Sequence, residues 1–104
     1  MQHSVTNWHV DRARAAEWEE IARQLDEMAR SAPGFLLART LRSVEHPGKF
    51  VVYGCWESRE HWENYFNRPE VQALIRRTFP LLKGPPQQEW FDLIAETRSP
   101  QPCR

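Results

Sequence analysis

The sequence has few cysteines, no net charge and no long apolar run, and each shortage excludes a class of protein. Its two cysteines, Cys55 and Cys103, have the spacing of neither a metal site nor a disulfide framework. No apolar stretch approaches the roughly 18 residues that span a bilayer. A formal net charge of zero provides no electrostatic surface for nucleic acid. We therefore expect no metal, no membrane association and no nucleic-acid partner.

We also expect no secretion, because MQHSVTNWHV has no basic region followed by a long apolar segment. Sparse cysteine is typical of a reducing compartment, so we expect a cytoplasmic protein. The length of 104 residues predicts one domain over 1–104. Within it, a folded core is expected at about 3–96, followed by a flexible tail at 97–104.

What the sequence does contain is a clear series of strands and helices. Strands are expected at 4–10, 35–44, 49–56 and 89–96 and helices at 12–31, after Ser58 and at 70–79. Asp11 and Ser58 are typical helix N-caps, and Pro33-Gly34 ends the first helix. The resulting β-α-β-β-α-β order predicts an α+β, ferredoxin-like fold. Its four-stranded antiparallel sheet would carry the helices on one face.

The strands are apolar on both faces, which indicates that the second face is also covered. Phe35, Leu37 and Leu41 share one face of their strand by parity, whereas Leu36 and Ala38 share the other. Helices can cover only one side of such a sheet, and monomers rarely expose large apolar patches. We therefore expect a homodimer in which two sheets pack face to face, as in a dimeric α/β-barrel.

The segment from 33 to 69 also resembles a known family. Pro33-Gly34-Phe35, a strand with Arg39 and Leu41, Pro47-Gly48, Trp56-Glu57-Ser58 and an aromatic helix followed by Pro69 resemble the antibiotic biosynthesis monooxygenase (ABM) family. The resemblance covers roughly residues 3 to 96. It implies a dimeric α/β-barrel with a pocket between the sheet and the helices of each protomer. Because one fold serves many chemistries, the fold alone does not choose among the activities of the family.

The first activity that the resemblance implies is a cofactor-independent monooxygenase. Such an enzyme holds a small aromatic or enolisable substrate and stabilises its anion, so that dioxygen attacks the carbanion. Residues of matching chemical type are Asn7, Trp56 and Tyr65 as catalytic groups, with Arg39 and Tyr53 as substrate-binding groups. The alternative for each is structural: Trp56 could be core, Asn7 a solvated edge residue, and Arg39 an ion-pair partner across the dimer.

Further substrate-binding candidates are His9, Trp62, Phe66 and Leu74. Trp62 and Phe66 belong to an aromatic stripe that is more often core than binding site. His9 has the same parity as Asn7, so both would line the pocket if that face meets the helices. If that face meets the partner, His9 is an interface residue instead. Parity alone does not decide between the two arrangements.

The second implied activity is haem degradation, for which the sequence departs from the pattern. The resemblance places the iron-ligating histidine of such relatives at Leu74, and Leu cannot bind iron. Ligation by another group, such as His9 or Tyr65, is left open, so haem is disfavoured and no cofactor is expected. A third interpretation, of a different class, is a non-catalytic dimer whose pocket holds a small apolar ligand.

Overall fold

The computed structural model of the chain describes residues 1–101. Cys103 and the end of the tail expected at 97–104 lie outside the described residues. The elements in chain order are β1 (Gln2–His9), η1 (Arg12–Arg14), α1 (Ala15–Ala29), β2 (Phe35–Arg42), β3 (Lys49–Trp56), α2 (Arg59–Phe66), α3 (Pro69–Thr78), η2 (Phe79–Leu81) and β4 (Gln87–Phe91).

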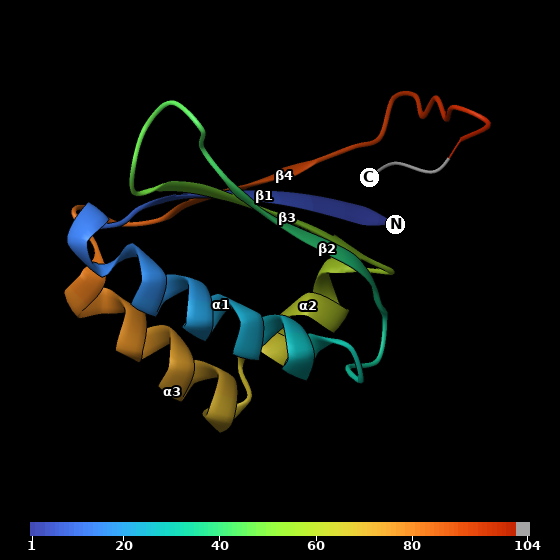
Figure 1. Ribbon diagram of the computed structural model, residues 1–104. Helices are drawn as coiled ribbons and strands as arrows, with labels where there is room; N and C mark the ends of the chain where they lie inside the picture. Colours follow the sequence, from blue (N-terminus) through green and yellow to red (C-terminus); the bar gives the residue numbers. More distant parts are fainter. Residues whose placement is uncertain (102–104) are drawn as a thin grey trace.

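These elements form two layers, a sheet and a layer of helices. The strand order is β2-β3-β1-β4, and every neighbouring pair is antiparallel. Helices α1, α2 and α3 all lie on one face of the sheet (Figure 1). The α+β, ferredoxin-like fold expected from the sequence is confirmed. Among the described residues, none of the helices is long and apolar enough to cross a membrane.

A β-bulge near the start of β2 changes which residues share a face. Phe35 pairs with Trp56, but Leu37 already pairs with Cys55, so Leu36 is an extra residue on this strand. Phe35 therefore lies on the helix side of the sheet, whereas Leu37 and Arg39 lie on the opposite side. The expectation that Phe35 shares a face with Leu37 and Leu41 was wrong, because strict alternation fails across a bulge.

Two element boundaries also differ from expectation. The segment expected as one helix at 12–31 begins with a separate 3₁₀ turn, whose N-cap Asp11 accepts a hydrogen bond from the Ala13 amide. The strand expected at 89–96 is instead β4, which ends at Phe91. Phe91 pairs with His3, close to the beginning of β1, so the residues after Phe91 have almost no strand to pair with.

The core between the two layers consists of two aromatic-rich clusters. In the first, Trp18 of α1 stacks on Phe50 of β3 with ring centroids 4.3 Å apart. In the second, Trp56, Tyr65 and Val71 join β3 to α2 and α3. Burying side chains of this size stabilises the fold by about 1.5–3 kcal/mol each. The helices are thus fixed against the sheet at both ends of the protein.

The opposite face of the sheet, here called the open face, carries no helix from residues 1–101 (Figure 1). By register it carries the odd-numbered residues of β1, β3 and β4 and those of β2 after the bulge. Leu37, Leu41 and Phe91 on this face are all more than two-fifths exposed. A sheet face with several exposed large apolar side chains is typical of an interaction surface.

Candidate active site

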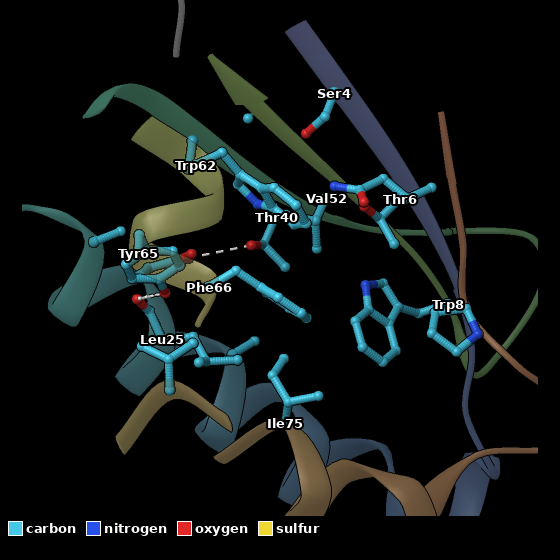
Figure 2. A pocket seen from close by; sticks show the side chains of 18 of the residues that line it. Ser4, Thr6, Trp8, Leu25, Thr40, Val52, Trp62, Tyr65, Phe66 and Ile75 are labelled. Carbon is cyan, nitrogen blue, oxygen red and sulfur yellow. Dashed lines mark hydrogen bonds between the residues drawn. The ribbon is translucent and has the colours of Figure 1, made fainter. Parts of the chain in front are cut away.

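A cavity of about 350 Å³ lies between the sheet and the helices. Its sheet side includes Ser4, Thr6 and Thr40, and its helix side includes Leu25 and Ile75 (Figure 2). Most of the wall is apolar, with a few polar groups among the aromatic rings. This volume and this lining are typical of a site for a small organic molecule.

Aromatic rings from β3 and α2 form one end of the cavity. Trp56 is 5.2 Å from Tyr65 between ring centroids, and Trp62 stacks on Phe66 at 4.7 Å. All four residues line the cavity, and their predicted roles in catalysis or substrate binding stay predictions. The helical spacing of Trp62, Tyr65 and Phe66 places all three rings on the inner side of α2. Flat, polarisable walls of this kind favour a flat, aromatic ligand.

The Tyr65 hydroxyl is already engaged in a hydrogen bond. It donates to the backbone carbonyl oxygen of Leu25 in α1 at 2.8 Å (Figure 2). Burial, together with the nearby charge of Asp26, raises the pKa of Tyr65 far above its usual range. A tyrosine held neutral and already donating cannot remove a proton from a substrate. In this geometry Tyr65 joins α2 to α1 and forms part of the cavity wall.

Two hydrogen-bond donors converge on the sheet side next to Gly54. A methyl group added at Gly54 would lie 3.3 Å from Ser4 Oγ and 3.4 Å from Trp56 Nε1. Gly54 and both neighbours line the cavity, and the missing side chain leaves this part of the floor open. Among the residues described, no hydrogen bond engages either donor atom, so both can donate to a ligand oxygen.

Asp26 of α1 is a cavity residue that the sequence analysis did not single out. Its Oδ2 accepts a hydrogen bond of 3.2 Å from the Thr40 hydroxyl on β2. Burial raises the pKa of the Asp26 carboxyl above its ordinary value, and the Thr40 hydrogen bond opposes this in part. One signal could have identified it: Asp26 stands four residues after Ala22 and three before Ala29, both of which are buried.

Four of the candidates from the sequence lie outside the cavity. Asn7, His9, Arg39 and Tyr53 all occupy the open face, because the even-numbered residues of β1 face the helices. Tyr53 forms a hydrogen bond of 2.5 Å with His3 Nδ1 on that face. Asn7 and His9 therefore share a face, as parity predicted, but it is not the face that meets the helices. The predicted role of Asn7 in catalysis, and those of His9, Arg39 and Tyr53 in substrate binding, stay predictions.

Leu74 does not line the cavity either, because it packs in the core with Trp8 and Trp18. Haem ligation is a poor fit to the cavity. Its walls include no histidine, cysteine or methionine from the part of the chain that the structure describes. Tyr65 is the one lining residue with a recognised iron-binding group, and its hydroxyl donates to Leu25. The donor set thus does not match that of a haem pocket.

Comparisons with known proteins agree with one another. The family model described as "Antibiotic biosynthesis monooxygenase" matches residues 1–77. A protein of that description from Caulobacter crescentus has a similar structure, with a TM-score of 0.84, 23% identity and 90% of each chain covered. SnoaB, a cofactor-independent oxygenase from Streptomyces nogalater, gives a TM-score of 0.80 at 17% identity, over 96% of this chain and 97% of its own.

A third similar structure, from Nitrosomonas europaea, has a TM-score of 0.85 and 15% identity, with 93% of each chain covered. At these identities the solved structures establish the fold alone. A search of curated proteins found no match. The match to the family model covers well over half of the chain and is the stronger finding.

Proposed function

The chain belongs to the antibiotic biosynthesis monooxygenase family, and we propose that its cavity oxygenates a small aromatic or enolisable molecule without a bound cofactor. The observation that carries the proposal is the cavity itself: an apolar, aromatic-walled space with two free donors and one carboxylate. A flat substrate with one ionisable C–H or O–H group matches these walls in shape and polarity.

The cavity volume agrees with a substrate of two or three fused rings. Trp56, Trp62 and Phe66 offer ring faces at one end, which would orient such a molecule by stacking. Apolar walls exclude water from the reacting carbon and strengthen electrostatic interactions inside the site. Apolar walls by themselves disfavour a substrate anion, so hydrogen-bond donors that meet the developing charge are needed to stabilise it.

The proposed reaction converts an activated methylene group into a carbonyl. Loss of a proton leaves an electron pair on the substrate carbon, and that carbanion reduces dioxygen and forms a C–O bond with it. The resulting peroxide takes up a proton and loses water, leaving a carbonyl group. One dioxygen thus supplies the carbonyl oxygen and one water molecule, so no external reductant is required.

Trp56 Nε1 and Ser4 Oγ would stabilise the negative charge that develops on the substrate oxygen. Both donors lie beside Gly54, so one ligand oxygen placed there would meet both of them. Preorganised donors aimed at a developing oxyanion are among the strongest catalytic effects available to a protein. Trp56 is therefore assigned here the role of an anion-stabilising donor.

We also propose that the protein is a homodimer formed through the open face. The exposed Leu37, Leu41 and Phe91 would then be buried against the same residues of a second copy. Asn7, Arg39 and Tyr53 share that face and would lie in or near the interface. Their predicted roles in catalysis (Asn7) and in substrate binding (Arg39 and Tyr53) would then depend on the dimer.

Dioxygen consumption tests the proposed activity. With 1,8-dihydroxyanthrone as the substrate, we expect the purified protein to consume dioxygen and release the anthraquinone without added metal, flavin or haem. The rate should exceed autoxidation of the substrate by at least tenfold and should persist after treatment with a chelator.

A panel of anthrones, quinols and other enolisable aromatics should be tested as well, so that the result does not depend on one substrate. Uptake equal to background across the whole panel would count against an oxygenase. If the protein still binds those compounds at micromolar concentration, with quenching of its tryptophan fluorescence, a non-catalytic binding protein becomes the better description.

A further inference from the structure

We propose that Asp26 is the general base of this site, and that its carboxylate removes the proton from the substrate carbon which dioxygen then attacks. The inference rests on the proposed function and deepens it by naming the group that starts the reaction. Family membership does not supply it, because Asp26 lies in α1, outside every motif that carries the resemblance.

Asp26 is the one cavity-lining residue, among those the structure describes, whose side chain is ordinarily ionised at neutral pH. Tyr65 is the other titratable group in the wall, and its hydroxyl donates to Leu25. The hydroxyls of three threonines and one serine, and the amide of one glutamine, also line the cavity and are far too weakly basic. If a proton is taken from a substrate inside this cavity, Asp26 is the acceptor that the wall provides.

The carboxylate of Asp26 is held in place from the opposite layer. The Thr40 hydroxyl on β2 donates to Asp26 Oδ2, so the bond spans the gap between α1 and the sheet. In Figure 2, Thr40 points from the sheet toward the helix layer, on the same side of the cavity as Tyr65. The Thr40 hydroxyl thus orients the Asp26 carboxylate, just as a third group often orients the catalytic base in other enzymes.

Asp26 and Thr40 also border a second hollow on the outer side of the same gap. That groove is lined by Glu19 and Arg23 of α1 and by Arg42 of β2. Because Asp26 touches both hollows, it can accept a proton from the cavity and release it toward solvent. Asp26 can therefore lose its proton and become a carboxylate again while the substrate is still in the cavity.

Within residues 1–101, no arginine near Asp26 forms an ion pair with it, so its carboxylate is not occupied by a salt bridge there. Arg42 is paired with Glu19, and Arg23 also approaches Glu19, so neither forms an ion pair with Asp26. Tyr65 of α2 faces it as a neutral group. Burial raises the pKa of Asp26 toward the working pH, which makes its carboxylate a stronger base than an exposed one.

The proposed proton transfer involves only the substrate and Asp26. The substrate C–H bond breaks, its electron pair stays on carbon, and an O–H bond forms on Asp26. Dioxygen enters only afterwards, as the oxidant of the carbanion. The same proton can return to the peroxide, after which Asp26 is again a carboxylate.

Anaerobic hydrogen–deuterium exchange isolates this step from oxygenation. With 1,8-dihydroxyanthrone in D₂O under argon, proton NMR follows loss of the methylene signal. We expect the wild-type protein to accelerate exchange and Asp26→Asn to lower that catalysed rate by about 10²–10⁴-fold. Glu27→Gln is the matched control: it removes an exposed carboxylate one residue away and should leave the rate unchanged.

Thr40→Val provides a second, independent variant. Loss of its hydrogen bond removes stabilisation of the charged carboxylate, so the pKa of Asp26 should rise further. The acid limb of the exchange rate against pH should move to higher pH, while the plateau above it changes little. A purely structural role of Asp26 would leave the position of that limb unaltered.

Each outcome separates the two proposals. Exchange that depends on Asp26 without any dioxygen uptake supports the base and refutes the oxygenase. Dioxygen uptake and exchange that Asp26→Asn changes by less than threefold refute the base and leave the oxygenase standing. A wild-type protein that binds the anthrone but does not accelerate exchange overturns the role of Asp26.

Discussion

Asp26 is the residue at which function and stability are expected to oppose each other. Its carboxylate is half-buried, accepts a hydrogen bond from Thr40 and has no ion-pair partner in the described part of the chain. In the sequence its spacing from Ala22 and Ala29 is the one signal of an inward position, and it is easily missed because Glu19, Glu20, Arg23 and Glu27 make the helix strongly charged. Trp56 and Tyr65, by contrast, could be singled out from the aromatic pattern of strand and helix, and their predicted catalytic roles stay predictions.

The stability of Asp26→Asn should depend on pH. Burial raises the pKa of Asp26 in the folded protein above its unfolded value, so ionising this group costs the native state stability. That cost is absent below about pH 4, grows as pH rises through the folded pKa and then stays constant. We expect Asp26→Asn to raise Tm by a few degrees at pH 7.

Calorimetry or circular dichroism at a series of pH values measures this difference. The gain should shrink as pH falls and disappear in acid. Glu27→Gln, which changes an exposed carboxylate, should show no comparable trend. A variant that is less stable than the wild type at pH 7 would mean that the Thr40 hydrogen bond outweighs the burial cost.

At the level of elements, local signals predicted the strands and helices well, and tertiary context decided the rest. The strand at 49–56 was predicted to the residue, because a turn and a run of β-favouring residues delimit it. The fourth strand was predicted too far toward the C-terminus. The apolar residues after Phe91 favour a strand, but β1 begins at Gln2 and leaves them almost no residues to pair with. The bulge after Phe35 depends on cross-strand register, which no single segment encodes.

The turn between α1 and β2 offers a test of how these elements are joined. Gly34 has a φ of +81°, and a Cβ there would lie 2.3 Å from His61 Cγ in α2. Gly34→Ala should therefore cost about 1–3 kcal/mol through backbone strain and displacement of α2. The substitution would therefore displace the part of α2 that forms one end of the cavity.

Denaturant unfolding measures this cost, and Gly84→Ala is the matched control, since a Cβ at Gly84 meets nothing within 4 Å. Combining Gly34→Ala with His61→Gly should recover part of the loss, because His61 Cβ, Cγ and Cδ2, which all lie within 2.6 Å of the added Cβ, are then removed while the unfavourable φ remains. Equal effects of the two glycine substitutions would show that the contact with His61 is unimportant.

For the whole molecule, the sequence predicted the fold and an interaction surface but not which residues belong to each side. Alternation along β1 divides Asn7 and His9 from Thr6 and Trp8, yet it does not say which set meets the helices. Only packing of the aromatic residues of α1 and β3 decides this. The candidates Asn7, His9, Arg39 and Tyr53 lie on the open face rather than in the cavity, and their predicted roles stay predictions.

Sedimentation velocity tests the proposed dimer. We expect the wild-type protein to sediment as a dimer at micromolar concentration and Leu41→Lys to shift it toward the monomer, because a charge would be buried at the interface. Val44→Lys is the control: Val44 is 98% exposed in the loop beyond β2, so the dimer should persist. A wild-type protein that remains monomeric would contradict the assembly.

The hydrogen atom that serves as the side chain of Gly54 has a consequence for selectivity. An alanine at that position is compatible with the backbone, yet its methyl group would stand against Ser4 and Trp56 on the cavity floor. We expect such a chain to reject the bulkier, three-ring molecules before the two-ring ones. In related enzymes, the size of the residue at this position would then limit the size of the compounds that they accept.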